Sequence, residues 1–150
     1  MSQNAPFIYL DHVADIRFIA RGETLNTLFE NAALATLSVI ADIETVTPEI
    51  DFEIELETVS LENLMVDFLS ELLFLFDAEE TVIGRVNVSK VGTYETESGE
   101  KKYFIKAIAS GEQIDRARQD FRTEVKAVTY NGIRVDQTED GYETEVVLDL

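Results

Sequence analysis

The stretch "IDFEIELETVSLENLMVDFLSELLFLFDAEE", Ile50 to Glu80, changes its hydrophobic period near the middle. From Ile50 to Glu57 apolar residues alternate with acids, which is typical of a strand with one face in water. From Leu61 onward apolar residues recur every three or four positions, which predicts a helix with a wide buried stripe. The stripe consists of Leu61, Leu64, Met65, Phe68, Leu69, Leu72 and Phe76. Ser60 precedes it as a plausible N-cap, so this stretch joins a strand directly to a helix.

The chain before and after this stretch contains a further helix and several strands. "IRFIARG", Ile16 to Gly22, alternates like a strand, and "ETLNTLFENAALATLSVIAD", Glu23 to Asp42, has helical spacing with Thr24 as a cap. "FRTEVKAVTYNGIRVDQ" predicts a strand that turns near Asn131-Gly132 and continues. Further strands are predicted over residues 81–91, 101–110 and 142–150. The predicted fold class is α+β, with two helices packed on a mainly antiparallel sheet in one domain, 1–150.

The composition excludes several classes of protein. Of the 150 residues, 45% are hydrophobic, which is enough for a core, and none is cysteine, which rules out disulfides and thiolate metal sites. The start "MSQNAPFIYL" lacks the pattern of a signal peptide, and "LLFLF" is too short to cross a bilayer. These features are compatible with a cytoplasmic protein, and we expect no membrane contact.

The chain is strongly acidic. Thirty Asp and Glu residues face 12 Lys and Arg residues, which gives a net charge of −18. Such a field repels phosphate backbones, so we expect no autonomous binding of nucleic acid. The field favours cations and basic protein partners, although an adaptation for solubility in a salty cytoplasm explains the total charge as well.

Three short stretches carry candidate site residues. "LDHVADI", Leu10 to Ile16, holds the single histidine, His12, between Asp11 and Asp15. Two nearby carboxylates are the beginning of a site for a hard cation, but they also suit a polar loop that caps a turn. "VVLDL" sets the side chain of Asp149 beside the main-chain oxygens of Leu150, which fits either a ligand pair or a frayed acidic end.

The third stretch is "TEVKAVTY", Thr123 to Tyr130, which contains one of only five lysines. On a strand, Lys126 would share a face with Val128 and Tyr130. Lys126 could then hold a carboxylate or a phosphate, or simply lie in solvent. The sequence has no G-x-S-x-G elbow and no phosphate-binding G-x-x-x-x-G-K-[ST] loop.

Together these motifs resemble the archease family over nearly the whole chain. The H-T-A-D motif of the family corresponds to His12-Val13-Ala14-Asp15, and its E-V-K-A-(V/I)-T-Y motif is intact from Glu124 to Tyr130. Its G-x-(S/T)-x-x-x-x-F pattern runs from Gly22 to Phe29, and its terminal D-(I/L) corresponds to Asp149-Leu150. The order and the gaps agree, so the whole set is far more specific than any one motif.

The resemblance implies a cytoplasmic cofactor protein with the archease-type strand-helix-strand-strand fold. Archease proteins assist the tRNA-splicing RNA ligase, which joins RNA ends through a guanylylated histidine and divalent metals, by promoting guanylylation and multiple turnover. They do not join RNA themselves. The matched metal ligands are Asp15, Asp149 and the main-chain oxygens of Leu150, and their all-oxygen chemistry favours calcium or magnesium. Asp11, His12 and Lys126 would orient the site or contact the partner.

Two departures and two other functions stay open at this point. Val13 stands where many family members have Thr, and Asn131 stands where many have His, so any contribution of that histidine to ligase contact is in doubt. A chaperone-like interaction module with a vestigial metal site is one alternative. A metal-dependent phosphoesterase is the other, although the chain offers few basic residues to hold its substrate.

Overall fold

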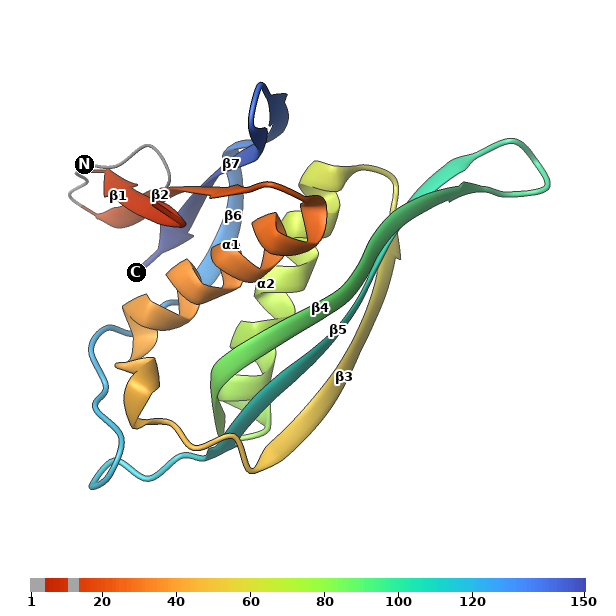
Figure 1. The fold of residues 1–150 in the computed structure, drawn as a ribbon. Coiled ribbons are helices and arrows are strands. Elements are labelled where there is room, and N and C mark those ends of the chain that lie inside the picture. Colours follow the sequence, from red (N-terminus) through yellow and green to blue (C-terminus); the bar gives the residue numbers. More distant parts are fainter. Residues whose placement is uncertain (1–4, 11–13) are drawn as a thin grey trace.

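The computed structural model describes residues 5–10 and 14–150. The helices and strands follow the order β1 (Phe7–Leu10), β2 (Asp15–Gly22), α1 (Leu25–Ile40), a short 3-10 helix (Ile43–Thr45), β3 (Ile50–Thr58), α2 (Leu61–Ala78), β4 (Thr81–Glu95), β5 (Lys101–Gln113), β6 (Ala127–Thr138) and β7 (Gly141–Asp149). Figure 1 shows the two helices crossing the centre of the molecule. The predicted α+β class with two helices and antiparallel strands is confirmed.

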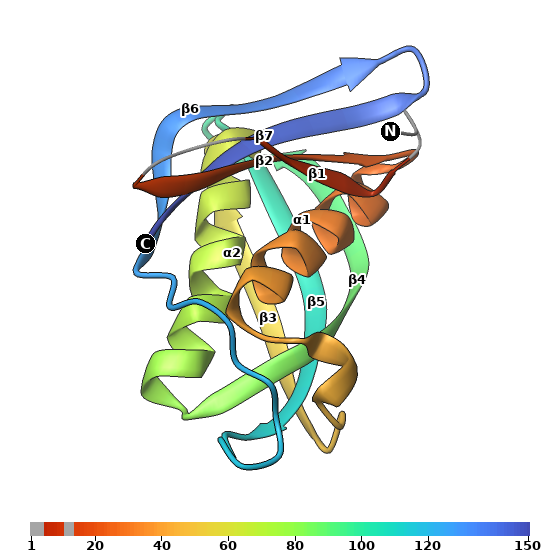
Figure 2. The same ribbon diagram turned by 90° about the vertical axis from the view of Figure 1, so that its left-hand side faces the viewer.

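The strands form two sheets, and the helices lie between them (Figure 2). One sheet has four strands in the order β1-β2-β7-β6, and the other has three in the order β3-β5-β4. All pairs are antiparallel. Both helices contact strands of both sheets, which explains why the apolar stripe of α2 is so wide. We predicted one sheet, and the structure has two. The sequence pattern does not specify which strands pair, so it could not show this division.

The start of each helix follows the predicted capping. The hydroxyl of Thr24 accepts the N–H of Thr27, and the hydroxyl of Ser60 accepts the N–H of Asn63. Each bond satisfies a donor that the first helical turn leaves free. The helices meet through Phe29 and Phe68, whose ring centroids are 5.8 Å apart in the fully buried core.

The segment before β6 differs from the prediction. We predicted a strand from Phe121, but β6 begins at Ala127. The main chain of this segment binds the end of α1 instead: the N–H of Arg122 donates to the carbonyl of Ile40 at 2.8 Å, and that of Thr123 to the carbonyl of Val39 at 3.1 Å. It thereby satisfies carbonyls that a helix end leaves without partners.

Two further strand features depart from the predicted ranges. The Asn131-Gly132 pair forms a register shift inside β6 between Thr129 and Arg134, with Gly132 at φ +69°, so the strand bends there and continues as predicted. β4 and β5 run longer than predicted, and their hairpin extends away from the body (Figure 1). The short strand β1 was not predicted. Within the described residues, no helix is both long and apolar enough to span a membrane.

Candidate functional site

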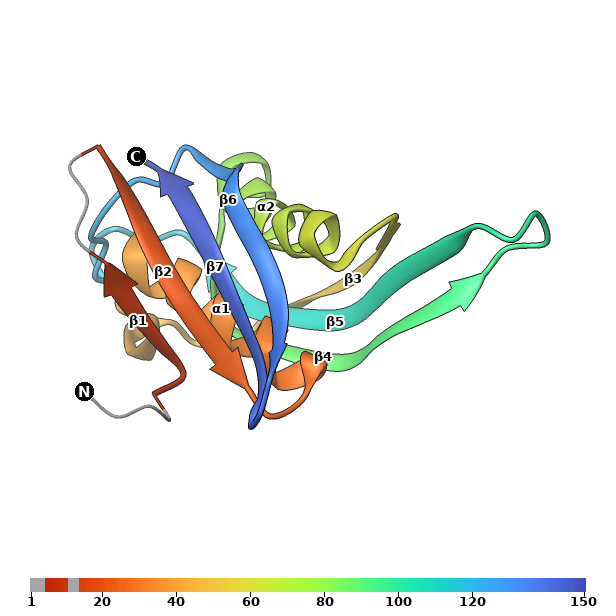
Figure 3. The same cartoon turned by 90° about the horizontal axis from the view of Figure 1, so that it is seen from above.

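The pairing of β2 with β7 places Asp15 directly opposite Asp149. Asp149 also lies opposite Ala127 of β6, and its carbonyl accepts the N–H of Lys126 at 2.8 Å. The start of β2, the end of β7 and the start of β6 therefore meet at one corner of the four-stranded sheet (Figure 3). The two acids matched to the metal ligands of the family therefore lie on neighbouring strands.

Both acids belong to the outer face of this sheet. Phe18 and Leu148 alternate with them along the strands and are fully buried on the helix side. Asp149 is exposed, and Asp15 is partly exposed. Carboxylates directly opposite each other on neighbouring strands weaken the pairing unless donors or a cation compensate for their charge. The geometry thus provides two oxygen-bearing side chains on one exposed face.

An ionic network covers the middle of the same face. Arg17 binds Glu145 at 3.3 Å, and Arg21 binds Glu143 at 2.8 Å. Arg134 of β6 contacts Glu143 at 2.8 Å and Glu145 at 3.4 Å, and it also binds Asp136. The arginines and acids compensate one another there, whereas Asp15 and Asp149 lie at the end of the face.

The network changes the protonation of its members. Burial alone would raise the pKa of Glu143, but hydrogen bonds from Arg134 and Arg21 lower it below its ordinary value. Burial would lower the pKa of Arg134, but the hydrogen bonds to Asp136 and Glu143 raise it. Sequence reasoning did not single out these residues. A signal was available in the sequence: Arg17 and Arg21 fall on one face of their predicted strand, and Glu143 and Glu145 fall on one face of another.

The other predicted site residues lie in different settings. Lys126 is exposed and comes just before β6, so the prediction that it shares a strand face with Val128 and Tyr130 is wrong. The β6–β7 register begins at Ala127, although the N–H of Lys126 already binds the carbonyl of Asp149. Leu150 follows Asp149 and packs partly against the core. Asp11 and His12 lie outside the described residues, so their predicted roles stay predictions.

The donor set fits a hard cation only in part. Across residues 5–10 and 14–150, no group of three or more His, Cys, Asp or Glu side chains is gathered in a way that could hold a metal ion. Calcium takes six to eight oxygen ligands, and magnesium takes six. Asp15 and Asp149, with main-chain oxygens such as those of Leu150, would supply part of such a shell, and water or another molecule would supply the rest.

The two described pockets lie away from this corner. One of about 640 Å³ is found at the opposite end of β2 and β7, beside Arg21 and Glu143. Another of about 450 Å³ lies on the three-stranded sheet. Neither is lined by Asp15 or Asp149.

Comparison with known proteins gives a consistent family. Residues 7–150 match the Archease protein family (MTH1598/TM1083). The "Protein archease" of Methanosarcina mazei is 46% identical over 149 residues, 99% of each chain, and that of Pyrococcus furiosus is 35% identical over 133 residues, 89% of each chain.

The fold is also found in a solved structure. The solution structure of Methanobacterium thermoautotrophicum protein 1598 superposes with a TM-score of 0.78 at 32% identity, covering 97% of this chain and 99% of that one. The family match spans the acid pair, both helices and both sheets. This chain therefore belongs to the archease family.

Proposed function

We propose that this chain is a metal-binding activator of the tRNA-splicing RNA ligase, and not an enzyme in its own right. In this role it works in the cytoplasm, promotes guanylylation of the ligase and lets the ligase turn over repeatedly. Membership of the archease family supports the tRNA-splicing RNA ligase as the partner of this chain. The observation that carries the proposal is the register of β2 and β7, which sets Asp15 opposite Asp149 on an exposed face.

The incompleteness of the oxygen set suits this role. Asp15, Asp149 and the main-chain oxygens of Leu150 would hold a calcium or magnesium ion. Asp11 and His12 would orient the site, and Lys126 would contact the partner. When bound, the ion would supply positive charge that the ligands of both proteins can share. An incomplete set of oxygen ligands leaves coordination positions open to a partner, whereas a closed protein cage would not.

The charge of the chain supports a protein partner over direct RNA binding. A net charge of −18 repels RNA phosphates and attracts a basic ligase surface. Electrostatic attraction of this kind raises association rates most at low salt. We therefore expect activation to weaken as the salt concentration rises, while the ligase alone changes less.

The test pairs this protein with the ligase of its own organism. Multiple-turnover joining of RNA ends with a 2′,3′-cyclic phosphate and a 5′-hydroxyl is measured with GTP and divalent metal. Asp149→Asn keeps the shape of the side chain and removes its charge, and we expect activation to fall roughly 10- to 100-fold. Glu139→Gln, in the exposed turn between β6 and β7, is the matched control and should retain activation.

A second readout needs no ligase. Calcium or magnesium bound by the folded chain should raise its thermal stability, by about 2.7 kcal/mol at a hundredfold excess over the dissociation constant. Asp149→Asn should abolish this increase, and Glu139→Gln should retain it. Full activation by Asp149→Asn would contradict the metal role and favour a plain interaction module. Failure of the wild-type protein to activate would contradict the function as a whole.

A further inference from the structure

The two edges of the three-stranded sheet differ in whether other parts of the chain bind their main-chain groups. At the β4 edge, side chains of α1 occupy the main-chain groups. The carboxylate of Glu30 accepts the N–H of Val88 at 2.7 Å. Asn26 accepts the N–H of Val91 at 2.9 Å and donates to the carbonyl of Ser89 at 3.2 Å. Over residues 88–91 this edge is therefore closed to another strand.

The β3 edge has no such cover. β3 has nine residues and pairs only with β5 within its sheet, and it lies at the outer margin of the molecule (Figure 1). In the part of the chain that the structure describes, no side chain donates to or accepts from its main chain. Every second residue of an edge strand directs its N–H and C=O away from its one neighbour. Such an edge is a template for an additional strand.

The outer face of β3 carries a row of acids. Asp51, Glu53, Glu55 and Glu57 are exposed and alternate with residues that face the helices. β5 compensates this row only in part: Ser110 donates to Asp51 at 2.7 Å, and Lys106 lies opposite Glu55. Glu53 lies opposite Ile108, which is 42% exposed. The row therefore presents negative charge with the two-residue period of an extended chain.

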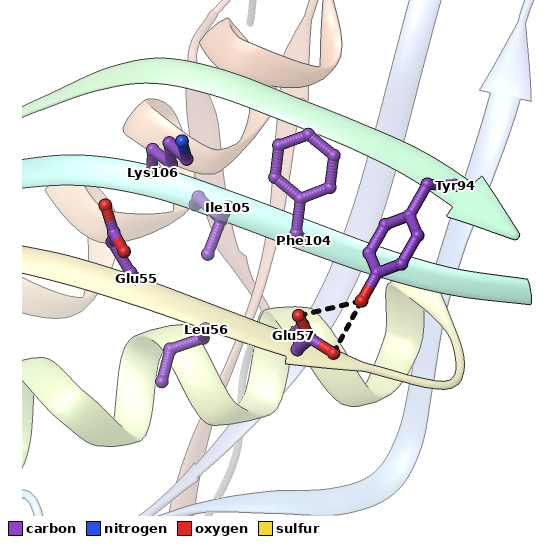
Figure 4. A pocket seen from close by; sticks show the side chains of 7 residues that line it. All are labelled: Glu55, Leu56, Glu57, Tyr94, Phe104, Ile105 and Lys106. Atoms are coloured by element: carbon purple, nitrogen blue, oxygen red, sulfur yellow. Dashed lines mark hydrogen bonds between the residues drawn. The ribbon is translucent and has the colours of Figure 1, made fainter. Parts of the chain in front are cut away.

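A pocket of about 450 Å³ opens beside this row (Figure 4). Glu55 and Glu57 line it from β3, Phe104 and Lys106 from β5, and Tyr94 from β4. The hydroxyl of Tyr94 donates to both carboxylate oxygens of Glu57, at 2.9 and 3.0 Å.

Aromatic rings shape the pocket from one side. The ring centroids of Tyr94 and Phe104 are 6.3 Å apart. The Phe104 ring covers Gly92 so closely that a Cβ there would lie 2.8 Å from it. Aromatic faces next to carboxylates are suited to the side chain of an arginine or a lysine.

We propose that the free edge of β3 takes up an extended basic segment of a partner protein as a fourth strand. The cationic side chains of the segment recur at every second position over the acid row, and one of them enters the pocket beside Tyr94. A second copy of β3 is disfavoured because the pairing would set acids against acids. The site belongs to the sheet on the other side of the helices from Asp15 and Asp149, so it is independent of the proposed metal site (Figure 2).

Synthetic peptides test the proposal without any ligase. The first probe is a capped nine-residue peptide in which lysine and valine alternate, and its binding is measured by calorimetry at low and moderate salt. An isomer of the same composition with all lysines at one end should bind about tenfold more weakly, because its charges lack the period of the row. Equal binding by the two isomers would overturn the proposal and leave only general attraction to an acidic protein.

Backbone methylation tests strand addition itself. Two versions of the alternating peptide carry N-methyl groups on the backbone. In one version the backbone nitrogens of the lysines are methylated, and in the other those of the valines. In a strand these two sets point to opposite edges. We expect one version to lose binding and the other to retain it. Retention by both versions would show that the peptide does not pair with β3 and would overturn the proposal.

Matched variants locate the site on the protein. The double variant Glu53→Gln with Glu55→Gln should weaken binding of the alternating peptide about tenfold. Adding Tyr94→Ala to this double variant should weaken binding further. Asp77→Asn with Glu79→Gln removes the same charge at the exposed end of α2 and should leave binding unchanged. Equal losses in the two double variants would overturn the assignment to β3, and thermal unfolding verifies that each variant is folded.

Discussion

At the scale of single residues, the ionic network beside the acid pair makes stability depend on pH. Glu143 accepts hydrogen bonds from Arg21 and Arg134, and they lower its pKa in the folded protein against the opposing effect of burial. A carboxyl whose pKa is lowered on folding stabilises the protein above its unfolded pKa, near 4.5. That stabilisation is lost as the pH falls through the folded value.

We therefore predict that Glu143→Gln destabilises the protein by about 1–3 kcal/mol at pH 7, where the charged hydrogen bonds are fully formed. The difference from wild type should shrink as the pH falls below about 4.5. Urea unfolding followed by circular dichroism across this range measures it. Glu139→Gln should follow the wild-type curve throughout, and a constant gap between wild type and Glu143→Gln at every pH would contradict the predicted linkage.

The candidate residues were predictable from the sequence to different degrees. Asp15 and Asp149 stand in short motifs, so their chemistry is local and visible in the printed chain. The contacts of Arg134 are not visible in this way, because the register shift in β6 decides which acids it meets. Register depends on the pairing of distant strands, and spacing along the chain does not specify it.

At the scale of elements, hydrophobic periods predicted both helices and most strands, because the period is a property of a short segment. The exception is the segment over residues 121–126. Its alternating pattern resembles a strand, yet its hydrogen bonds go to the end of α1. The four-residue strand β1 has too little alternation to stand out.

The bond from this segment to α1 leads to a prediction at Thr123. Thr123→Pro removes the N–H that reaches the carbonyl of Val39, and we expect a loss of about 1–3 kcal/mol in the free energy of unfolding. Thr123→Ala keeps the N–H at the same exposed position and should stay within about 0.5 kcal/mol of wild type. Thermal unfolding compares the two variants. Equal stabilities would mean that the segment does not stabilise the end of α1.

At the scale of the whole molecule, the helices between two sheets leave two outer faces with separate properties. One carries the arginine network and the acid pair, and the other carries the acid row of β3. The wide apolar stripe of α2 predicted that this helix is deeply buried. The division of the strands between two sheets could not be predicted, because it depends on contacts far apart in the sequence. Many of the remaining acids lie exposed in loops and turns, outside either face.

The excess of acids predicts how stability responds to salt. With 30 acidic and 12 basic residues, most charges on the folded chain repel one another. The screening length falls from about 30 Å at 0.01 M to about 3 Å at 1 M salt, so added potassium chloride should weaken this repulsion and raise the midpoint of thermal unfolding. The ion pairs of Arg134 with Glu143 and Glu145 are screened as well, but they lie close together and partly buried, where screening acts less. Asp77→Asn with Glu79→Gln, which removes two exposed charges, should show a smaller rise than wild type. A midpoint that falls with salt would mean that attraction within the network outweighs repulsion across the whole surface.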